Sequence, residues 1–523
     1  MSEKEAPGWA TNELALRKTV EEWIEEAMRR QELVPWHGIT DEGTFTESWG
    51  GYYLLTGDGK VLEFMYKLRD GFLEWGNRTG ALYHGYYAEG DAHHHPETWI
   101  FFLGHLWWLE KNGRNVEVLE DAAHHIGNWV KDVPEWYDWE THCFRGGYPA
   151  IGTRVVKEYP PYNYEAPTFF RFVQMALNVY LATGKERYLR FSRDYADKWC
   201  DLILKPGLPP SNLYPAEYSM EERTKLYAAT SHRRVEEGDL SHYGSGYVPD
   251  VLIDLYALTE GKRYLEAAMK MLRLFWDYTD KPNVCPYCAW TLAKYRKLTG
   301  DTSYDEVAMK NVRPLMERPL PTILLYEGPE VRYGMKYAYR NPGGVIEEYE
   351  VPAWYWWSAT QNLAMAYQIS GDLRFLNRAM TLTERTLRLA KPWLRDGREH
   401  GCEGQLLHHA AGHAAAYILS SASMGLYRFC GGDMTEVRYL SEEGKPGLPE
   451  GVAALLDPTD GGRVVRLYND HEDDVRVKIQ VCNTDLKIRQ VKVDGSLSRD
   501  FSGQVATITV KAGRTLKVCI DLA

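Results

Sequence analysis

The stretch "LLTGDGKVLE" (Leu54–Glu63) decides the fold, because close variants of it recur along the chain. The other copies are "KNGRNVEVLE" (Lys111–Glu120), "ATGKERYLR" (Ala182–Arg190), "LTEGKRYLE" (Leu258–Glu266), "LTGDTSYDE" (Leu298–Glu306) and "ISGDLRFLN" (Ile369–Asn377). In each copy a glycine stands after an apolar segment, where the C-terminus of a helix needs a left-handed residue. A polar residue then opens the next helix. The repeat therefore predicts a series of helical hairpins with tight turns.

The two helices of each predicted hairpin differ in kind. The first is apolar nearly all round, as in "FFRFVQMALNVYLATG" (Phe169–Gly184). The second carries one apolar stripe on a charged helix, for example Tyr188, Phe191, Tyr195, Trp199 and Leu202. A helix that is apolar all round belongs inside a protein, and a striped helix belongs outside. The chain is therefore expected to alternate inner and outer helices.

This alternation resembles the (α/α) toroid superfamily of six-hairpin glycosidases and polysaccharide lyases. The resemblance covers about residues 11–430. It implies a mainly α fold, an (α/α)6 or (α/α)7 toroid, with residues 1–430 as the catalytic domain. The number of hairpins stays open because residues 403–427 read as a seventh inner helix.

The pattern changes near the C-terminus. Segments of alternating polar and apolar residues, separated by Gly, Asn and Asp, fill residues 435–523. They predict a small antiparallel β-sandwich, interpreted as an accessory domain. Residues 319–351 also contain a hairpin-like pattern before the next inner helix.

Composition narrows the class of function. The net charge of −12 argues against a nucleic-acid partner, and no segment is apolar enough to span a membrane. The N-terminus has no export signal, and the eight cysteines lack a disulfide-framework spacing, so a cytoplasmic location is expected. The 18 Trp and 36 Tyr residues suit an oligosaccharide or polysaccharide partner, with an anionic one among the candidates. The oligomeric state is not indicated.

Chemistry-bearing residues gather just before the predicted inner helices. In an alternating toroid the inner helices run the same way, so their N-terminal ends share one face with the long loops, and the helix dipoles favour anionic groups there. The segments concerned are residues 41–49, 89–99, 162–170, 238–247, 284–290, 347–357 and 399–409. Substrate-binding candidates in and beside them are Glu47, Trp49, Asp91, Glu97, Arg171, Glu350, Trp354 and Glu403.

The preferred hypothesis is a lyase that acts on uronic acids. β-Elimination needs a base for the C5 proton, an acid for the leaving oxygen and a group that neutralises the carboxylate. Toroid lyases use Tyr and His as base and acid, and the resemblance implies the same roles for His242, Tyr243, Tyr164 and His94, with Arg171 at the carboxylate.

The alternative is a glycoside hydrolase. It needs two carboxyl groups, roughly 5–5.5 Å apart for retention or 6.5–9.5 Å for inversion, and one of them must have a raised pKa. Candidates are Asp91, Glu97, Glu165, Asp239, Glu350 and Glu403, and the sequence does not pair them. A non-catalytic carbohydrate-binding protein is the alternative of another class.

Each candidate also has a structural explanation. Glu97, Glu165 and Glu403 suit helix N-termini, and Trp and Tyr residues often fill cores. No metal or other cofactor is firmly indicated, and a divalent metal stays open: His409 and His413 share a helix face but lack a paired carboxylate. Cys285 and Cys288 have redox-motif spacing without a βαβ context, which favours a structural role.

Overall fold

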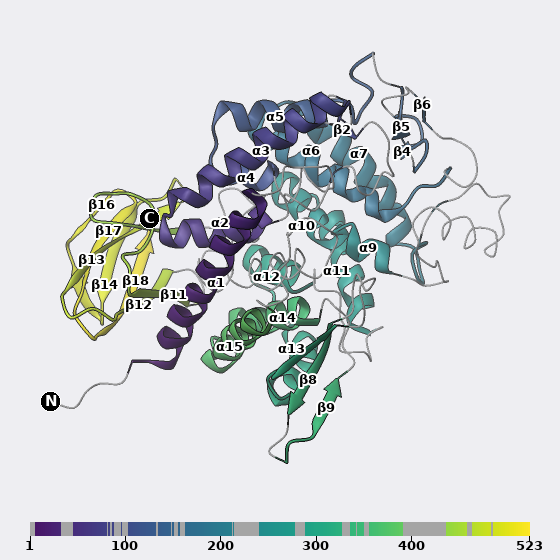
Figure 1. Cartoon of the computed structure of the whole chain (residues 1–523). Helices are drawn as coiled ribbons and strands as arrows, with labels where there is room; N and C mark the ends of the chain where they lie inside the picture. Colours follow the sequence, from purple (N-terminus) through teal and green to yellow (C-terminus); the bar gives the residue numbers. More distant parts are fainter. Residues whose placement is uncertain are drawn as a thin grey trace. The chain divides into compact units, whose positions relative to one another are not determined.

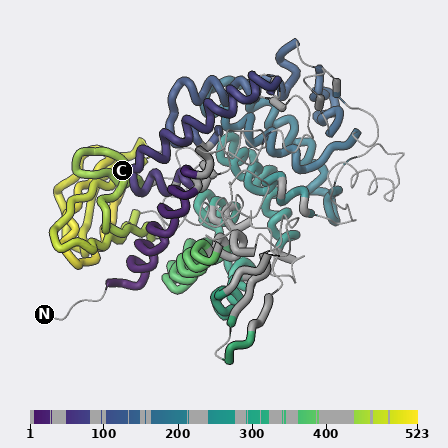
Figure 2. Tube along the Cα trace, viewed as in Figure 1, coloured from purple at the N-terminus to yellow at the C-terminus, as the bar shows by residue number. Residues whose placement is uncertain are grey.

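The fold is described by a computed structural model with two compact units (Figure 1). The first unit contains residues 1–34, 45–65 and 282–523, and the second contains residues 35–44 and 66–281. Figure 2 traces the chain along its Cα atoms, and the structure describes the backbone of only some residues. These are residues 6–32, 45–80, 82–83, 86–87, 96, 103–131, 134–147, 149–150, 155–156, 163–211, 213, 240–277, 288–326, 335–340, 343–349, 355–390, 436–457, 463–482 and 485–523.

The second unit consists of helical hairpins with short β-hairpins between them. Figure 1 shows α6 beside α7 and α10 beside α11, and each pair packs together. Its helices are the C-terminal part of α3 (Gly59–Thr79), α4 (Gly104–Leu109), α5 (Gly113–Ala123), η3 (Pro167–Phe169), α6 (Phe170–Thr183), α7 (Glu186–Ile203), α9 (Ser241–Ser245), α10 (Val248–Thr259) and α11 (Lys262–Asp277). Its antiparallel strand pairs are β1 (Leu82–Tyr83) with β2 (Tyr86–Tyr87), β3 (Tyr137–Asp138) with β4 (Cys143–Phe144), and β5 (Pro149–Ala150) with β6 (Val155–Val156).

The predicted difference between inner and outer helices is confirmed in this unit. Residues 170–179 of α6 are all buried, whereas α7 buries one stripe that includes Tyr188, Phe191, Tyr195 and Trp199. Leu202, expected to end the stripe, is only half-buried, and Ile203 is buried instead. The outer helix therefore presents its charged face away from α6.

Five of the six repeated turns have the same hydrogen bonds. In each, a left-handed residue donates its N–H to the carbonyl four residues earlier at 2.7 or 2.8 Å; these residues are Gly57, Gly184, Glu260, Gly300 and Gly371. The preceding hydroxyl group donates to a helix carbonyl and accepts from the N–H two residues on; it belongs to Thr56, Thr183, Thr259, Thr299 and Ser370. Each turn thus satisfies the carbonyls and N–H groups that a helix end leaves open.

Two copies of the repeat depart from the expected glycine position. At Leu258–Glu266 the left-handed residue is Glu260, with φ 58°. Gly261 lies against the Tyr264 ring, because a Cβ added to this glycine would stand 2.9 Å from a ring carbon. At Lys111–Glu120 the C-cap is Glu110, which is extended, and Gly113 is the first residue of α5. The expectation of a left-handed glycine is wrong at both turns, because other residues make the cap.

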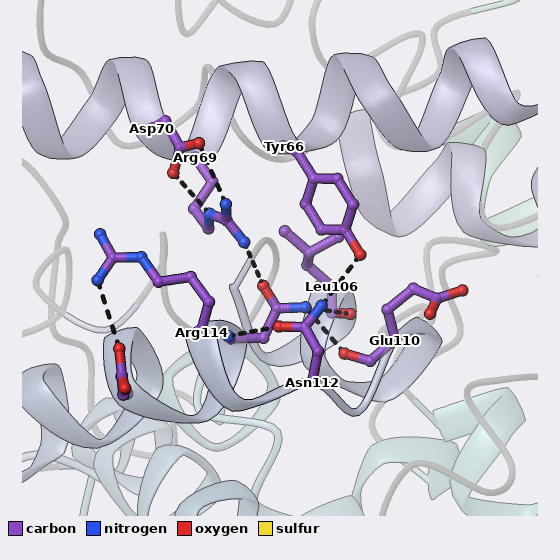
Figure 3. A network of polar contacts seen from close by, with 9 residues as sticks. Tyr66, Arg69, Asp70, Leu106, Glu110, Asn112 and Arg114 are labelled. Atoms are coloured by element: carbon purple, nitrogen blue, oxygen red, sulfur yellow. Dashed lines mark hydrogen bonds and ion pairs between the residues drawn. The ribbon is translucent and has the colours of Figure 1, made fainter.

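Side chains close the Lys111–Glu120 turn (Figure 3). Asn112 caps α5 by accepting from the Asn115 N–H at 2.9 Å, and its amide donates to the Tyr66 hydroxyl at 3.1 Å. Asn115 is buried, donates to the Glu110 carbonyl at 2.8 Å and accepts from the Arg69 guanidinium at 2.7 Å. This network fixes the turn to α3 without a left-handed residue.

The first unit joins the beginning and the end of the chain. Helix α1 packs against α15, and its Trp23 indole donates to the Leu387 carbonyl at 3.0 Å. The helices of this unit are α1 (Gly8–Glu32), α2 (Phe45–Thr56), the start of α3, α12 (Cys288–Thr299), α13 (Asp305–Glu317), α14 (Tyr355–Ser370) and α15 (Leu373–Ala390). The hairpin expected within residues 319–351 is confirmed as an antiparallel sheet of β7 (Ile323–Tyr326), β8 (Met335–Arg340) and β9 (Ile346–Tyr349).

A β-sandwich ends the chain, as predicted. One antiparallel sheet has the order β10 (Glu436–Leu440), β13 (Val475–Cys482), β17 (Val505–Val510) and β16 (Phe501–Ser502). The other has the order β11 (Val452–Asp457), β12 (Arg463–Asn469), β18 (Thr515–Leu522), β14 (Ile488–Val493) and β15 (Ser496–Ser498). The predicted fold class, helical hairpins followed by an antiparallel sandwich, is confirmed.

The sandwich packs on helices of the first unit. Arg17 of α1 donates to the Val452 carbonyl at 2.9 Å, and the Tyr367 hydroxyl of α14 donates to Asp457 at 2.8 Å. The sandwich and these helices therefore form one compact unit. The predicted division between residues 430 and 435 lies in a stretch, residues 391–435, outside the described part, and it stays a prediction.

Two further properties concern the described residues. No described helix is both long and apolar enough to cross a membrane. Cys143, Cys200, Cys482 and Cys519 are free thiols.

Candidate active site

The structure describes the side chains of six predicted site residues. Five of them, Tyr164, Glu165, Arg171, His242 and Tyr243, lie in the second unit and are all buried. The sixth, Trp49, belongs to α2 in the first unit, where its ring lies 5.7 Å from that of Phe64. The predictions for Asp91, His94, Glu97, Asp239, Glu350, Trp354 and Glu403 fall outside the described residues, and for Glu47 only the backbone, in α2, is described.

Glu165 is the predicted residue with the most closely defined surroundings. It forms a two-way backbone bridge with Leu213, with N···O distances of 2.9 and 2.8 Å. Ala166 follows in an extended conformation, and Pro167 opens η3 immediately before α6. A proline at this position suits the start of a helix, because its missing N–H has no intrahelical partner there. Glu165 thus stands at the start of an inner helix, as the sequence predicts.

The Glu165 carboxyl group is enclosed and hydrogen-bonded on both oxygens. The backbone N–H of Phe144 in β4 donates to Oε2 at 2.6 Å, and the hydroxyl group of Tyr195 in α7 donates to Oε1. Burial raises the pKa of Glu165 to about 8, although both hydrogen bonds act to lower it. At neutral pH the group is therefore mainly a protonated carboxylic acid.

Two titratable neighbours of Glu165, Cys143 and Tyr195, also keep their protons, and the nearby Lys198 acts only to lower the Glu165 pKa. Burial, and after it the Glu165 carboxylate, raise the pKa of the Cys143 thiol to about 12. The Tyr195 pKa lies well above its ordinary value for the same two reasons, burial first. The ring of Tyr137 lies 5.5 Å from that of Phe144 and 6.5 Å from that of Tyr195. Glu165 is thus an acid in an aromatic surrounding, an arrangement that keeps its proton bound.

Tyr243 and His242 occupy the short helix α9. The Tyr243 hydroxyl donates to the Pro210 carbonyl at 2.7 Å, and its ring meets that of Trp199 edge-on at 5.9 Å. Burial raises the pKa of Tyr243, which disfavours the phenolate that a tyrosine base requires. His242 has no exposed surface. Their predicted roles as base and acid stay predictions, and the described geometry gives Tyr243 the surroundings of a structural residue.

Tyr164 and Arg171 lie on either side of η3 in the sequence. The Tyr164 ring covers Gly147, where an added Cβ would stand 2.3 Å from a ring carbon. The Arg171 guanidinium carbon lies 6.0 Å from the centre of the Tyr247 ring, which is the distance of a cation–π contact. Tyr247 itself has a left-handed backbone, with φ 56°. Arg171 is buried, so any contact with a substrate carboxylate stays a prediction.

Sequence reasoning missed the two hydrogen-bond donors to Glu165. Tyr195 belongs to the apolar stripe of α7, and its hydroxyl group donates a hydrogen bond to Glu165, which lies 30 positions earlier in the sequence. Phe144 contributes a backbone N–H, which no side-chain pattern can reveal. The one sequence signal for Tyr195 is a polar group at the tip of a side chain in an apolar stripe. Tyr188 and Trp199 of the same stripe also carry such a group, so the signal does not single out Tyr195.

The described residues contain no group of three or more His, Cys, Asp or Glu side chains that could hold a metal ion. His409, His413 and Cys285 lie outside them, and for Cys288 only the backbone, in α12, is described.

Comparison with known proteins finds structural likeness only. No protein-family model and no curated protein matches the sequence. Among solved structures, an unsaturated glucuronyl hydrolase specific for heparin is 10% identical, with a TM-score of 0.40, over 73% of this chain and 98% of its own. A family 76 glycoside hydrolase from a bovine Bacteroides thetaiotaomicron strain is 9% identical, with a TM-score of 0.40, over 77% of both chains. A GH127 β-arabinofuranosidase is 13% identical, with a TM-score of 0.32, over 98% of this chain and 76% of its own.

These three proteins are glycosidases, the group named by the sequence resemblance. At such identities and TM-scores they indicate neither the activity nor the substrate of this chain.

Proposed function

We propose that this protein is a carbohydrate-active enzyme that hydrolyses glycosidic bonds, with Glu165 as the carboxylic acid that protonates the leaving oxygen. One observation carries the proposal: Glu165 is buried, its pKa is raised to about 8, and both of its oxygens are held by hydrogen bonds. A glycosidase acid must still hold its proton at working pH, and burial is the usual means. The acid role also requires that the leaving oxygen reach this carboxyl group, whose residue is 4% exposed.

The hydrogen bonds of Glu165 suit both of its protonation states. Before transfer the acid proton remains bound because burial disfavours the carboxylate. After transfer the carboxylate accepts from the Phe144 N–H at Oε2 and from the Tyr195 hydroxyl at Oε1. Donors fixed in advance reduce the free-energy cost of the charge that forms. Tyr195 and Phe144 are therefore proposed as positioning residues.

Hydrolysis also needs a second carboxylate, as base or nucleophile. The sequence candidates for it are Asp91, Glu97, Asp239, Glu350 and Glu403, all of which lie before predicted inner helices. Which of them pairs with Glu165 stays a prediction.

The chemistry of the described residues favours hydrolysis over β-elimination. The lyase hypothesis draws its base and acid from His242, Tyr243, Tyr164 and His94, and a tyrosine base must lose its proton. Burial opposes that loss at Tyr243, and the hydroxyl hydrogen is already donated to the Pro210 carbonyl. For Glu165 the direction is the opposite, because burial supports the protonated form that an acid needs.

The test uses neutral and uronate oligosaccharides with two readouts. Hydrolysis releases reducing ends, whereas β-elimination adds an unsaturated product that absorbs in the ultraviolet. We expect reducing ends without the absorbance. Glu165→Gln should lower the rate by about 100-fold or more, the usual contribution of general acid catalysis. The matched control is Glu140→Gln, an exposed glutamate in the same unit.

An activated leaving group separates an acid from a merely structural residue. Aryl glycosides with a weakly basic leaving group need little protonation, so Glu165→Gln should lose much less activity on them than on an oligosaccharide. Equal losses on both substrates would contradict the acid role. Appearance of the unsaturated product would instead favour the lyase, with His242 as the residue to substitute next.

A further inference from the structure

A pocket lies beside α7, lined by residues that the mechanism above does not use. Its volume is about 740 Å³, within the usual range for small-ligand sites. It is lined by Trp129, Trp139, Glu186, Arg187, Leu189, Arg190, Arg193 and Asp194. The Glu165 contact of α7 comes from Tyr195 on its buried stripe, whereas the pocket arginines 190 and 193 are exposed. The pocket is therefore distinct from the carboxylic acid site.

Two tryptophans form one wall of this pocket. Their ring centres lie 6.3 Å apart. The Trp139 indole donates to the Gly127 carbonyl at 3.0 Å, and Trp129 meets the Tyr188 ring edge-on at 5.0 Å. The Trp129 ring packs closely on Gly127, because a Cβ added to this glycine would stand 2.4 Å from a ring carbon. Both indoles are half-buried and held in place by these contacts.

Arginines of α7 lie over these indoles. The Arg187 guanidinium carbon is 5.0 Å from the Trp129 ring centre, and that of Arg190 is 5.1 Å from Trp139. A guanidinium group that stacks on an aromatic face loses less rotamer freedom when it binds an anion. Arg187 already donates to the Tyr188 hydroxyl at 2.9 Å and pairs with Glu120 at 3.4 Å, so the exposed arginines of the pocket are Arg190 and Arg193. Arg193 follows one turn later and is exposed. The pocket thus presents a row of planar, forked donors.

Carboxylates stand among these arginines. The Oδ2 atom of Asp194 lies 3.5 Å from the Nε atom of Arg190, and Glu186 also lines the pocket. A polyanion such as nucleic acid would be repelled by both acids. A ligand with one oxyanion and several hydroxyl groups fits better, because its hydroxyls can donate to Asp194 and Glu186 while the oxyanion accepts from the guanidinium groups.

We propose that this pocket binds an anionic sugar unit, bearing a carboxylate or a sulfate, independently of bond cleavage. The stacked arginines bind the oxyanion, the acids bind hydroxyl groups, and the indoles supply the apolar wall. The site is a second saccharide-binding site on the outer helix, and it does not require that the proposed hydrolase activity be correct.

The test is a set of calorimetric titrations of the whole protein. The probes are trigalacturonate, a sulfated disaccharide, neutral maltotriose and inorganic sulfate. We expect trigalacturonate or the sulfated disaccharide to bind at least about 10-fold more tightly than maltotriose and inorganic sulfate, the effect of one charge-assisted contact. The carboxylate and sulfate probes distinguish the two sources of the oxyanion. Equal affinity for charged and neutral sugars, or binding of inorganic sulfate alone, would overturn the proposal.

Variants locate the binding. The double substitution R190Q/R193Q removes two exposed charges and should weaken binding of the charged sugar by about 10-fold or more. The matched control is Arg374→Gln on α15, whose arginine is also exposed and also pairs with one aspartate. Unchanged affinity in R190Q/R193Q would refute the site. Binding that persists in Glu165→Gln while hydrolysis is lost would separate this pocket from the proposed active site, and loss of binding in that variant would overturn their independence.

Discussion

Substitution of Glu165 by glutamine should make the protein more stable at alkaline pH and leave it nearly unchanged at acidic pH. Glutamine mimics the protonated carboxyl group: its amide oxygen can accept from the Phe144 N–H, and its amide nitrogen can donate to the Tyr195 oxygen. In the wild type the pKa of Glu165 is about 8 in the folded state, compared with 4.5 as its ordinary value. The folded state therefore holds the proton more tightly than the unfolded state does.

The sign and size of the effect follow from proton linkage. A raised pKa contributes stability that is fully present below pH 4.5 and is lost as the pH rises to about 8. At about 1.4 kcal/mol per pH unit, the wild type loses roughly 5 kcal/mol over this range relative to a side chain that does not titrate. Glu165→Gln should match the wild type within about 1 kcal/mol at pH 4.5 and exceed it by several kcal/mol at pH 9.

Urea denaturation at pH values from 4.5 to 9 measures this difference. Groups common to both proteins cancel when the wild-type free energy of unfolding is subtracted from that of the variant. The pKa of Cys143, at about 12, keeps that neighbour outside the range. Glu140→Gln, which changes an exposed glutamate, provides the control. A constant difference between Glu165→Gln and wild type across the whole range would refute a buried, protonated Glu165.

Four further substitutions test the fold by thermal and urea denaturation. Gly184→Ala should destabilise the protein by about 1 kcal/mol, because alanine tolerates the left-handed conformation poorly. Glu260→Gly should stabilise it by up to about 1 kcal/mol, because glycine adopts that conformation without strain. A destabilised Glu260→Gly variant would contradict the left-handed conformation of Glu260. Tyr367→Phe should cost about 1 kcal/mol through the lost bond to Asp457, and no change in the unfolding midpoint would show that the bond contributes nothing. Asn128→Ala should cost about 2–3 kcal/mol, since its side-chain oxygen accepts two backbone N–H groups at 2.8 and 3.0 Å, and an unchanged near-ultraviolet circular dichroism and midpoint would count against that role.

Much of the helical architecture could be predicted because its determinants are local. The turn needs a hydroxyl residue, a left-handed residue and a polar residue within a few positions, so a short phrase identifies it. The same locality explains the two departures. In one turn, Glu260 takes the left-handed conformation one residue before the expected glycine. In the turn at Asn112, hydrogen bonds from side chains of α3 and α5 take the place of a left-handed residue. The cap is required, and glycine is only its commonest form.

The site could be predicted only in part because its physics is not local. The position of Glu165 before an inner helix follows from its sequence neighbours. Its protonation depends on burial and on donors from Phe144 and Tyr195, which come from other elements. A phenol within an apolar stripe reads as packing, and a backbone N–H leaves no trace in a sequence. Tyr243 shows the converse, since its burial and its bond to Pro210 are invisible until the loop is folded.

The division of the chain has a consequence for its synthesis on the ribosome. The second unit consists of residues 35–44 and 66–281, so it can close as soon as that length has emerged. Helix α1 is made long before its main partners, α15 and β11, which lie some 340 residues or more further along. Until then its apolar residues, including Trp23 and Ile24, which the folded protein buries, have no native surface to cover them. Helix α1 therefore waits longer for its native partners than the helices of the second unit do, and it is a segment on which a chaperone would act.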